Sequence, residues 1–563
     1  MLPSSSSPYR ALSLSGLAMM MIMAVMLVSQ TVEATTRSEE AINPSGDDRM
    51  VVDNPSASSM LVTSAITILV ILLSVFVIST YKVYKSYLKV KDIPGCWQYF
   101  FSPVKIPFFA PYFYMGNTEE TIKLVKQFGD KETKIVRISM VDRNTIFIVH
   151  PDMLKEYFLT KANTFEKPEF VYQMFNVYGE NILSALNTES WKKHFRVCSP
   201  AFSSKNLEYM CKVATQSSEL LFQRWDKGIK ENKPFILPLG NFSDVTLDIL
   251  GKAAFGVDFG VFSTDAEGTK LREAMENVIN YGVIVRRFVG DKSIFYPLIN
   301  KILGLDKAIK FCGDKLDEII KQRKEIIKKD GIDNVTQDIL SLLVEANMLE
   351  KLLTDDELKS NAFIMSLAGH ETTSTLLGWT LYELSKRPEI ANKLYHEITQ
   401  AIGSRDPTYD DYGILSHVNS VIMESLRLHP PVLSVVKSVA KKNTTIGKYN
   451  IPKGTIVLGW IDAIHHDEDV FKNPEEFIPE RFDNPEFKEK VQHDMTWIPF
   501  SMGNRKCIGY RFALLEGCMI LTKMVQKYKF KLLNDETVDP VKPKPGVTIR
   551  PSTNLKIQVI KRE

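Results

Sequence analysis

Two long apolar runs stand near the N-terminus, and helical periodicity dominates the rest of the chain. Residues 60–80 contain no charged side chain, and a helix of this length crosses a lipid bilayer. Acidic residues precede the run, whereas four lysines follow it within eleven residues: Lys82, Lys85, Lys89 and Lys91. Positive charge collects on the cytosolic side of membrane helices. The pattern therefore predicts a single transmembrane helix over 60–80, with the rest of the chain in the cytosol.

The first apolar run, from Leu12 to Val28, follows Arg10 and ends near small residues around Ala34. These flanks predict a signal peptide over 1–34 and a short lumenal segment over 35–59. The alternative is a first membrane helix that stays attached to the protein.

Residues 81–117, which follow the transmembrane run, are basic and rich in proline and aromatic side chains. Proline restricts its own backbone and that of the preceding residue, so this part predicts a stiff, extended connector rather than a helix.

From residue 118 to residue 563 the pattern is mainly helical, with short strands around tight turns near 445–461. The predicted fold class is mainly α with a minor β-sheet. The longest helix starts with a capping box formed by Thr354 and Glu357, and Pro388 ends it. Its length is roughly 30 residues, or about 45 Å. Such a helix spans a whole domain and should be buried on most sides.

The composition argues against some classes of partner and site but does not indicate a function. The chain has 563 residues and a formal net charge of +3, so nothing indicates a nucleic-acid partner. Its six cysteines show no CxxC spacing, which predicts neither a zinc site nor a disulfide framework. A buried, inert thiol is the ordinary interpretation of a lone cysteine, and we keep it for five of the six.

Cys507 is the exception, because its neighbours form a chemically specific pattern. A helix is expected to start directly after it, and unpaired N–H groups at a helix N-terminus favour a thiolate. Arg505 and Lys506 add positive charge nearby. Gly503 permits a tight turn, and Gly509 would let the backbone approach a flat cofactor.

The segment around Cys507 resembles the haem-binding signature of the cytochrome P-450 family at all five defining positions: Phe500, Gly503, Arg505, Cys507 and Gly509. The resemblance extends over about 94–556, and it implies a cytochrome P-450 fold with a haem-thiolate catalytic domain over 118–563. It implies non-covalent haem b with Cys507 as the axial ligand of the iron, Phe500 beside the thiolate and Arg505 paired with a haem propionate. Thiolate ligation favours cleavage of the O–O bond.

The middle of the long helix, from Ala368 to Thr373, looks like the oxygen-activation motif of the same family. The resemblance implies that Glu371 and Thr372 relay protons, a task that needs a carboxylate and a hydroxyl near bulk water. Gly369 is interpreted as leaving room for dioxygen. The alternative for Thr372 is a hydroxyl bonded to its own helix carbonyl. Relatives that attach haem covalently carry glutamate at the position of Ala368, so covalent attachment is not expected.

Glu424 and Arg427 are three residues apart on one helix face, and Arg481 follows further along the chain. The three resemble the buried Glu-Arg-Arg triad of the family, which implies a role in the fold and in haem incorporation. Taken alone the pattern is weak, because exposed helix pairs of this kind are common.

Two positions depart from the family pattern. Trp191 begins a helix like the family's Trp-x-x-x-Arg motif, but Phe195 stands at the arginine position. Arg196 is one residue further, which turns a helical side chain by about 100°.

The second departure is Ser438, which stands where many relatives carry a propionate-binding arginine. Lys437 is adjacent, and neighbouring residues on a strand face opposite sides. We therefore expect Trp191 and Arg505 to anchor the propionates, with loose haem retention as the consequence.

The resemblance implies a monooxygenase of the endoplasmic reticulum membrane, single-pass with its catalytic domain in the cytosol. Electrons would come from NADPH through NADPH–cytochrome reductase, with cytochrome b5 as a second donor. One atom of O2 would enter an apolar small molecule such as a lipid, sterol or terpenoid. The aromatic segment Phe165 to Tyr178 either lines the substrate pocket or belongs to the core.

Two alternatives remain open. One is a haem-thiolate isomerase or dehydratase that acts on peroxides, against which Glu371 and Thr372 argue. The other is a non-catalytic haem-binding sensor or carrier.

Overall fold

The computed structural model describes residues 55–97, 118–139, 144–231, 234–263, 267–282, 285–286, 289, 293–439, 442–544 and 546–563. The predicted signal peptide over 1–34, most of the predicted lumenal segment over 35–59 and the later part of the connector lie outside these residues.

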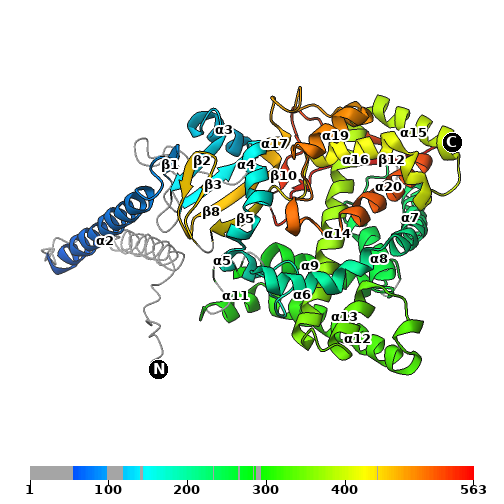
Figure 1. Cartoon of the computed structure of the whole chain (residues 1–563), viewed down its shortest axis with the longest axis horizontal. Helices are drawn as coiled ribbons and strands as arrows, with labels where there is room; N and C mark the ends of the chain where they lie inside the picture. The colour runs from blue at the N-terminus through cyan, green and yellow to red at the C-terminus, as the bar shows by residue number, and fades with distance from the viewer. Residues whose placement is uncertain are drawn as a thin grey trace, which may run out of the picture.

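The predicted membrane span falls within helix α2 (Pro55–Tyr87), which has 33 residues and extends past the first lysines. In Figure 1 this helix projects away from the body of the molecule. Its C-terminal end is tied to the sheet, because the Asn144 side chain donates to the Ser86 carbonyl over 2.9 Å. Among the residues that the structure describes, no helix is both long enough and apolar enough to cross a membrane. The span over 60–80 therefore stays a prediction.

A six-stranded sheet lies next to α2, with the strand order β1-β2-β3-β8-β5-β4. It joins segments far apart in the sequence: β1 (Gly95–Trp97), β2 (Ile135–Ser139), β3 (Asn144–Ile148), β4 (Phe165–Glu166), β5 (Ser434–Val439) and β8 (Ile456–Trp460). The strands β2 and β3 lie where only helices were predicted. Every residue of these two strands is buried, so they do not show the alternation that marks a half-exposed strand.

Three small two-stranded sheets complete the β-structure: β6 (Thr444–Ile446) with β7 (Tyr449–Ile451), β9 (Tyr528–Leu532) with β12 (Ile557–Lys561), and β10 (Pro543–Lys544) with β11 (Arg550–Pro551). The strands predicted near 445–461 are confirmed by β6, β7 and β8.

Helices form the rest of the body, as Figure 1 shows. The longer ones are α3 (Thr118–Phe128), α6 (Thr188–Cys198), α7 (Ser204–Glu231), α8 (Gly240–Ala254), α9 (Glu267–Asn277), α12 (Leu305–Asp330), α13 (Ile339–Met348), α14 (Asp355–Lys386), α15 (Pro388–Ile402), α16 (Ser416–Leu428), α19 (Pro485–His493) and α20 (Tyr510–Lys527). The shorter ones are α4 (Pro151–Lys155), α5 (Glu169–Tyr172), α11 (Tyr296–Ile302), α17 (Ile461–His465) and α18 (Glu480–Asp483). The mainly helical fold class with small sheets is confirmed.

Helix α14 is the predicted long central helix. It has 32 residues, and Thr354 and Glu357 form the predicted capping box at its start. Nearly all of its side chains from Leu358 onward are buried, with an exposed Ala368 near the middle. A helix buried on most sides therefore keeps one accessible point.

Gly369 lies directly after this point and has a packing role. A Cβ atom added there would lie 2.9 Å from Cδ1 of Leu250 on α8. The glycine thus allows α8 to approach α14 closely. The space beside it is occupied by Leu250, so its surroundings indicate a packing role and not room for dioxygen.

The aromatic segment Phe165 to Tyr178 belongs largely to the core. Phe165, Tyr172 and Phe175 are buried, and the half-buried Tyr178 packs edge-on against Phe363 with 5.1 Å between ring centroids. These side chains therefore favour the interpretation that the segment belongs to the core rather than lining the substrate pocket.

Candidate active site

A tight turn presents Cys507. The Cys507 N–H donates to the Phe500 carbonyl over 2.9 Å, which closes the turn. Gly503 within it has φ of +71°, and an added Cβ would collide with the Phe158 carbonyl oxygen. The predicted turn glycine is confirmed, because an L side chain would be strained there and would not fit. The Phe500 ring packs between Trp497 and Tyr510, with centroids 6.4 and 6.3 Å away.

Helix α20 begins at Tyr510, with Gly509 as its N-cap residue. A Cβ added to Gly509 would touch only Phe202, at 3.7 Å, and its φ is −87°. Neither backbone strain nor a protein neighbour requires glycine at this position. A close approach by a group that is not part of the chain remains as the physical reason for it.

Cys507 is exposed, whereas the other five cysteines are buried. Protein atoms still surround the thiol on most sides, and this burial raises its pKa. The Gly509 N–H and the charge of Lys506 act in the opposite direction and do not prevail. The N–H at the helix start and the charge of Lys506 thus favour the thiolate as expected, but burial of the thiol in the protein alone outweighs them. Coordination to a metal ion deprotonates a thiol outright, so iron is what would make Cys507 a thiolate.

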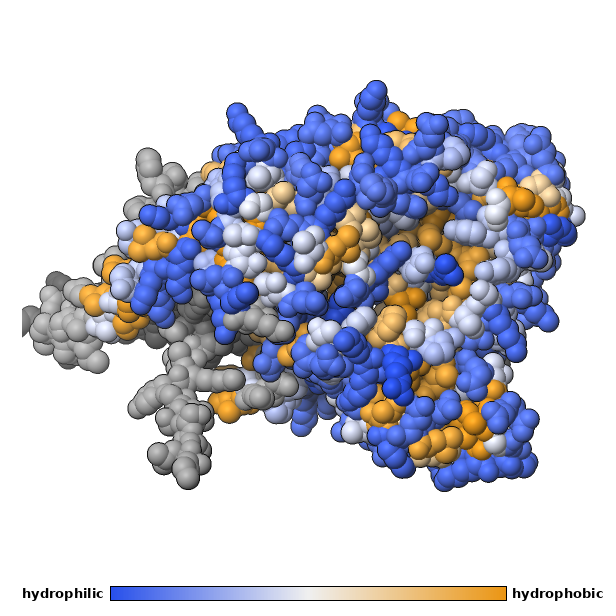
Figure 2. All heavy atoms as spheres, in the orientation of Figure 1, coloured by the Kyte–Doolittle hydropathy of each residue, from blue (hydrophilic) through white to orange (hydrophobic). Residues whose placement is uncertain are grey.

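The Cys507 turn and the middle of α14 border the same apolar cluster. Ile508, next to Cys507, packs against this cluster, and Leu367 of α14 is one of its buried members. Figure 2 shows an apolar hollow near the middle of one face of the molecule, bordered by polar side chains. An accessible cysteine, an N-cap glycine with free space beside it and the apolar packing of the adjacent Ile508 fit a flat, mostly apolar cofactor with one thiolate ligand. The residues present thus suit haem.

Glu371 and Thr372 point to different partners. The Thr372 hydroxyl donates to the Ala368 carbonyl over 2.7 Å, which is the helix-bonded alternative. Glu371 is only 1 % exposed, so its expected contact with bulk water is wrong. Its Oε1 accepts from the Thr548 hydroxyl at 2.5 Å and from Nε of Arg550 at 2.6 Å. The half-buried Arg550 separates this carboxylate from solvent.

The structure brings Glu424, Arg427 and Arg481 together. Glu424 and Arg427 are both fully buried, and Oε2 of Glu424 lies 2.7 Å from Nε of Arg427. Arg481 Nε lies 3.2 Å from the other carboxylate oxygen. Arg427 also donates to three backbone carbonyls that precede the Cys507 turn, those of His465, Pro474 and Glu476. The charges are therefore paired, and the segment between α17 and α18 is fixed to α16.

Arg505 lies in a small cavity beside the turn, over the ring of Trp191 at 4.6 Å from the ring centroid. It donates to the carbonyls of Ala185 at 3.1 Å and Asn187 at 2.9 Å. Burial lowers its pKa to about 10. Sequence reasoning placed Trp191 and Arg505 as partners at a propionate, and the structure brings these two together.

The two departures from the family pattern have different outcomes. Phe195 packs on Trp191 with 4.9 Å between ring centroids, and Arg196 is exposed, so Arg196 does not replace the missing arginine. Lys437, by contrast, is buried and lines the same cavity as Arg505. Lys437 on β5 and Arg505 in the turn therefore share this cavity, which strand alternation alone did not predict.

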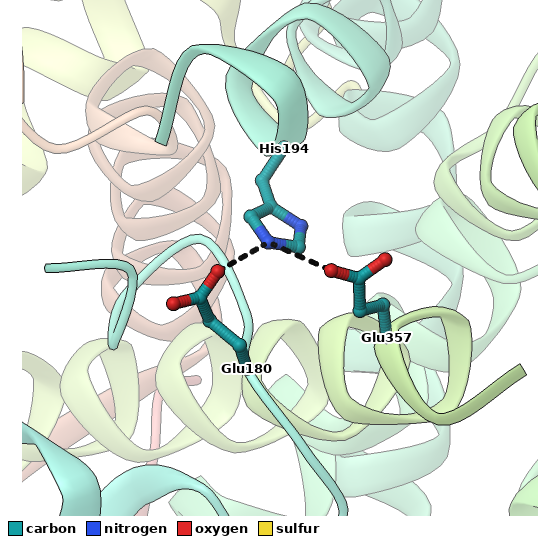
Figure 3. Close-up of side chains that lie close together, drawn as sticks. All are labelled: Glu180, His194 and Glu357. Atoms are coloured by element: carbon teal, nitrogen blue, oxygen red, sulfur yellow. Dashed lines mark ion pairs between the residues drawn. The ribbon is translucent and has the colours of Figure 1, made fainter. Parts of the chain in front are cut away.

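A second polar cluster joins α6, the loop before it and the start of α14. Figure 3 shows the His194 imidazole between the carboxylates of Glu180 and Glu357, with Nε2 at 3.6 and 4.0 Å from them. Burial lowers the pKa of His194. Lys193 already forms an ion pair with the Glu357 oxygen that faces His194. Asn361 Nδ2 approaches Nδ1 of the imidazole at 2.9 Å, and it also donates to the Glu357 carbonyl. We interpret this cluster as a structural link between α6 and α14.

Comparison with known proteins agrees with the site. The family model described as Cytochrome P450 matches residues 102–559. The chain belongs to the cytochrome P450 family. It is 31% identical to "Cytochrome P450 734A1" of Arabidopsis thaliana over 68% of this chain and 73% of that protein. It is 27% identical to "Cytochrome P450 3A11" of Mus musculus over 84% of this chain and 92% of that protein. It is 28% identical to "11-oxo-beta-amyrin 30-oxidase" of Glycyrrhiza uralensis, over 69% and 73%.

Membership of the P450 family makes the protein a monooxygenase, an oxidoreductase that uses haem iron and O2. The sequence motif around Cys507 already identified the five family positions in and next to the turn. Sequence reasoning considered Lys437 but did not place it beside Arg505, although a lysine inside a short apolar strand is itself an unusual signal.

The buried pair of Glu424 and Arg427 leads to a stability prediction. Arg427→Met leaves the buried Glu424 carboxylate with the Ile478 N–H and the longer contact to Arg481, and it removes the closest opposite charge. We therefore expect a loss of about 3–5 kcal/mol of unfolding free energy. Urea unfolding of the purified protein measures it. The exposed Arg511→Met serves as the control and should change stability by less than about 0.5 kcal/mol. A loss below about 1 kcal/mol for Arg427→Met would contradict a structural role for the pair.

Proposed function

We propose that this P450 is a haem-thiolate monooxygenase in which Cys507 is the axial ligand of non-covalent haem b. The observation that carries the proposal is Cys507 itself. It is the accessible cysteine among six, it stands after a turn that requires Gly503, and it precedes the N-cap residue of α20.

Bound haem supplies the activation of dioxygen, and the residues of the chain position the reactants and supply protons. The turn from Phe500 to Cys507 holds the thiol in place, and the Phe500 ring covers the turn. Thr372 is half-buried next to the exposed Ala368, so its hydroxyl can hold a proton donor at the accessible point of α14. Glu371, once released from Arg550, would take a proton from water and pass it to that point by reorienting its carboxyl group.

The substrate that we propose is an apolar small molecule of the lipid, sterol or terpenoid class. Figure 2 shows apolar side chains within the hollow, which favours an apolar ligand. Among the relatives, the printed names "11-oxo-beta-amyrin 30-oxidase" and "7-deoxyloganic acid hydroxylase" denote oxidation of small organic molecules. Electrons would come from NADPH through a reductase, with cytochrome b5 as a second donor.

We also propose that the protein is held in the endoplasmic reticulum membrane by residues 60–80, with the catalytic domain in the cytosol. Several large apolar side chains of α2 are more than half exposed: Val70, Ile71, Val77 and Ile78. Exposed apolar surface on a projecting helix suits a lipid environment.

The thiolate ligand is tested by the difference spectrum of the reduced protein with carbon monoxide. We expect the long-wavelength absorbance maximum of thiolate ligation, and we expect Cys507→Ser to lose it. Cys518→Ala, a change at the buried cysteine of α20, the helix that follows the Cys507 turn, should retain it. A maximum at the position of histidine-ligated haem in the unchanged protein would refute the thiolate.

Thr372 is tested by coupling of electron use to product. With a reductase, and with a substrate found by spin-shift screening of lipids, sterols and terpenoids, we expect Thr372→Ala to lower hydroxylated product about 10²-fold. NADPH consumption should continue and release hydrogen peroxide. Thr375→Ala removes the same kind of helix bond, here to the Glu371 carbonyl at 2.9 Å, from a buried position and is the matched control. Equal product from both variants would exclude the proton role of Thr372.

The membrane anchor is tested by carbonate extraction of cell membranes. A chain that starts at residue 55 should stay in the membrane pellet, because it keeps the apolar run. A chain that starts at residue 81 should move to the supernatant. If the longer chain is extracted as readily as the shorter one, residues 60–80 are not a membrane anchor.

A further inference from the structure

Three cationic side chains surround one small cavity beside the Cys507 turn. Lys437 comes from β5, Lys167 from the loop after β4, and Arg505 from the turn itself. The cavity is also lined by Trp191 and by one carboxylate, that of Glu166. Positive charge therefore exceeds negative charge around this cavity.

Lys437 is the most unusual of the three. It is only 5 % exposed, and within the described part of the chain no hydrogen bond or ion pair reaches its ammonium group. Its Nζ lies over the rings of Tyr157 and Phe158, 5.1 and 5.2 Å from the ring centroids. Burial, and then repulsion by Arg505, lowers its pKa to about 8. A buried ammonium without a hydrogen bond or an ion pair is costly in the protein alone.

The other two cations have neutral partners. Lys167 donates to the Leu183 carbonyl, and Arg505 donates to the carbonyls of Ala185 and Asn187. Burial also lowers the pKa of Lys167. Among the described residues, no carboxylate lies within ion-pair distance of any of the three cations. Glu166 and Glu180 act on Arg505 only from a longer distance. The local charge is thus not compensated by the protein.

We infer that Lys437, with Lys167 and Arg505, binds the carboxylates of the haem propionates, and that Lys437 replaces the arginine that position 438 lacks. The inference rests on the proposed function, because it requires haem at Cys507. Arg505 is only two residues from Cys507, so the cavity adjoins the ligand turn. Two propionate charges would offset most of the excess positive charge. With Lys437 as a propionate ligand, the loose haem retention that Ser438 predicts should not occur.

The decisive measurement is the rate of haem transfer from the ferric protein to apomyoglobin. Lys437→Met removes the charge and keeps the length of the side chain, whereas Lys437→Arg keeps the charge. Lys453→Met, at an exposed lysine between β7 and β8, is the matched control. We expect Lys437→Met to lose haem about tenfold faster, as loss of a charged hydrogen bond predicts. Lys437→Arg and Lys453→Met should stay within about threefold of the unchanged protein.

A second arm identifies the ligand group by reconstitution with haem dimethyl ester, which lacks both carboxylate charges. The unchanged protein should lose the ester quickly, and Lys437→Met should cause no further loss with the ester. If Lys437→Met accelerates loss of haem and of its ester equally, the lysine does not bind propionate. The true ligand of Lys437 could instead be a free anion. The protein would then retain the haem ester, this retention would depend on Lys437, and it would rise with added phosphate. That result would also overturn the inference.

Stability of the haem-free protein separates binding from a merely structural role. Lys437→Met removes an uncompensated buried charge, so the urea midpoint of the haem-free protein should stay unchanged or rise. A lower midpoint together with faster haem loss would show that Lys437 supports the fold instead. The carbon monoxide spectrum of each variant is recorded in parallel. If it lacks the thiolate maximum in the unchanged protein as well, the proposed function fails, whereas failure of the inference alone leaves that maximum in place.

Discussion

A helix of 32 residues cannot be buried along its whole length and still serve a reaction unless one point on it stays accessible, and α14 meets this constraint at Ala368. The close contact of Gly369 with α8 holds the helix on one side of that point. On the other side, the residues that follow the Cys507 turn pack against the same hydrophobic cluster. Packing on both sides therefore fixes the helix at this point, and the positions of Glu371 and Thr372 depend on how α14 is held.

Buried charged side chains of this protein have two different environments. Glu424 and Arg427 are paired with each other, and Glu371 is paired with Arg550, so these charges contribute to a fixed arrangement of segments. Lys437 has no such partner among the described residues. A group of cations left uncompensated at one cavity concentrates electrostatic cost there. A bound anion would remove this cost.

The sequence predicted those features that depend on neighbouring residues. The capping box of Thr354 and Glu357, the turn at Gly503 and the helix after Cys507 are all local, and the structure contains each of them. The strands β2 and β3 were missed because both are fully buried, and their apolar run has no alternation to distinguish it from a helix. The partners of Glu371, the packing of Gly369 and the direction of Lys437 were also missed. Each depends on a segment more than 100 residues away in the chain, which no local pattern encodes.

The contact between Gly503 and the Phe158 carbonyl has a consequence for how the protein is made. Phe158 and Trp191 leave the ribosome more than 300 residues before the turn that meets them. Contacts between segments so distant in the chain form late in folding. Cys507 therefore reaches its place only after the segment from Phe500 to Cys507 has been synthesised and has packed against these earlier residues. A chain truncated before Cys507 would lack the proposed ligand of the iron.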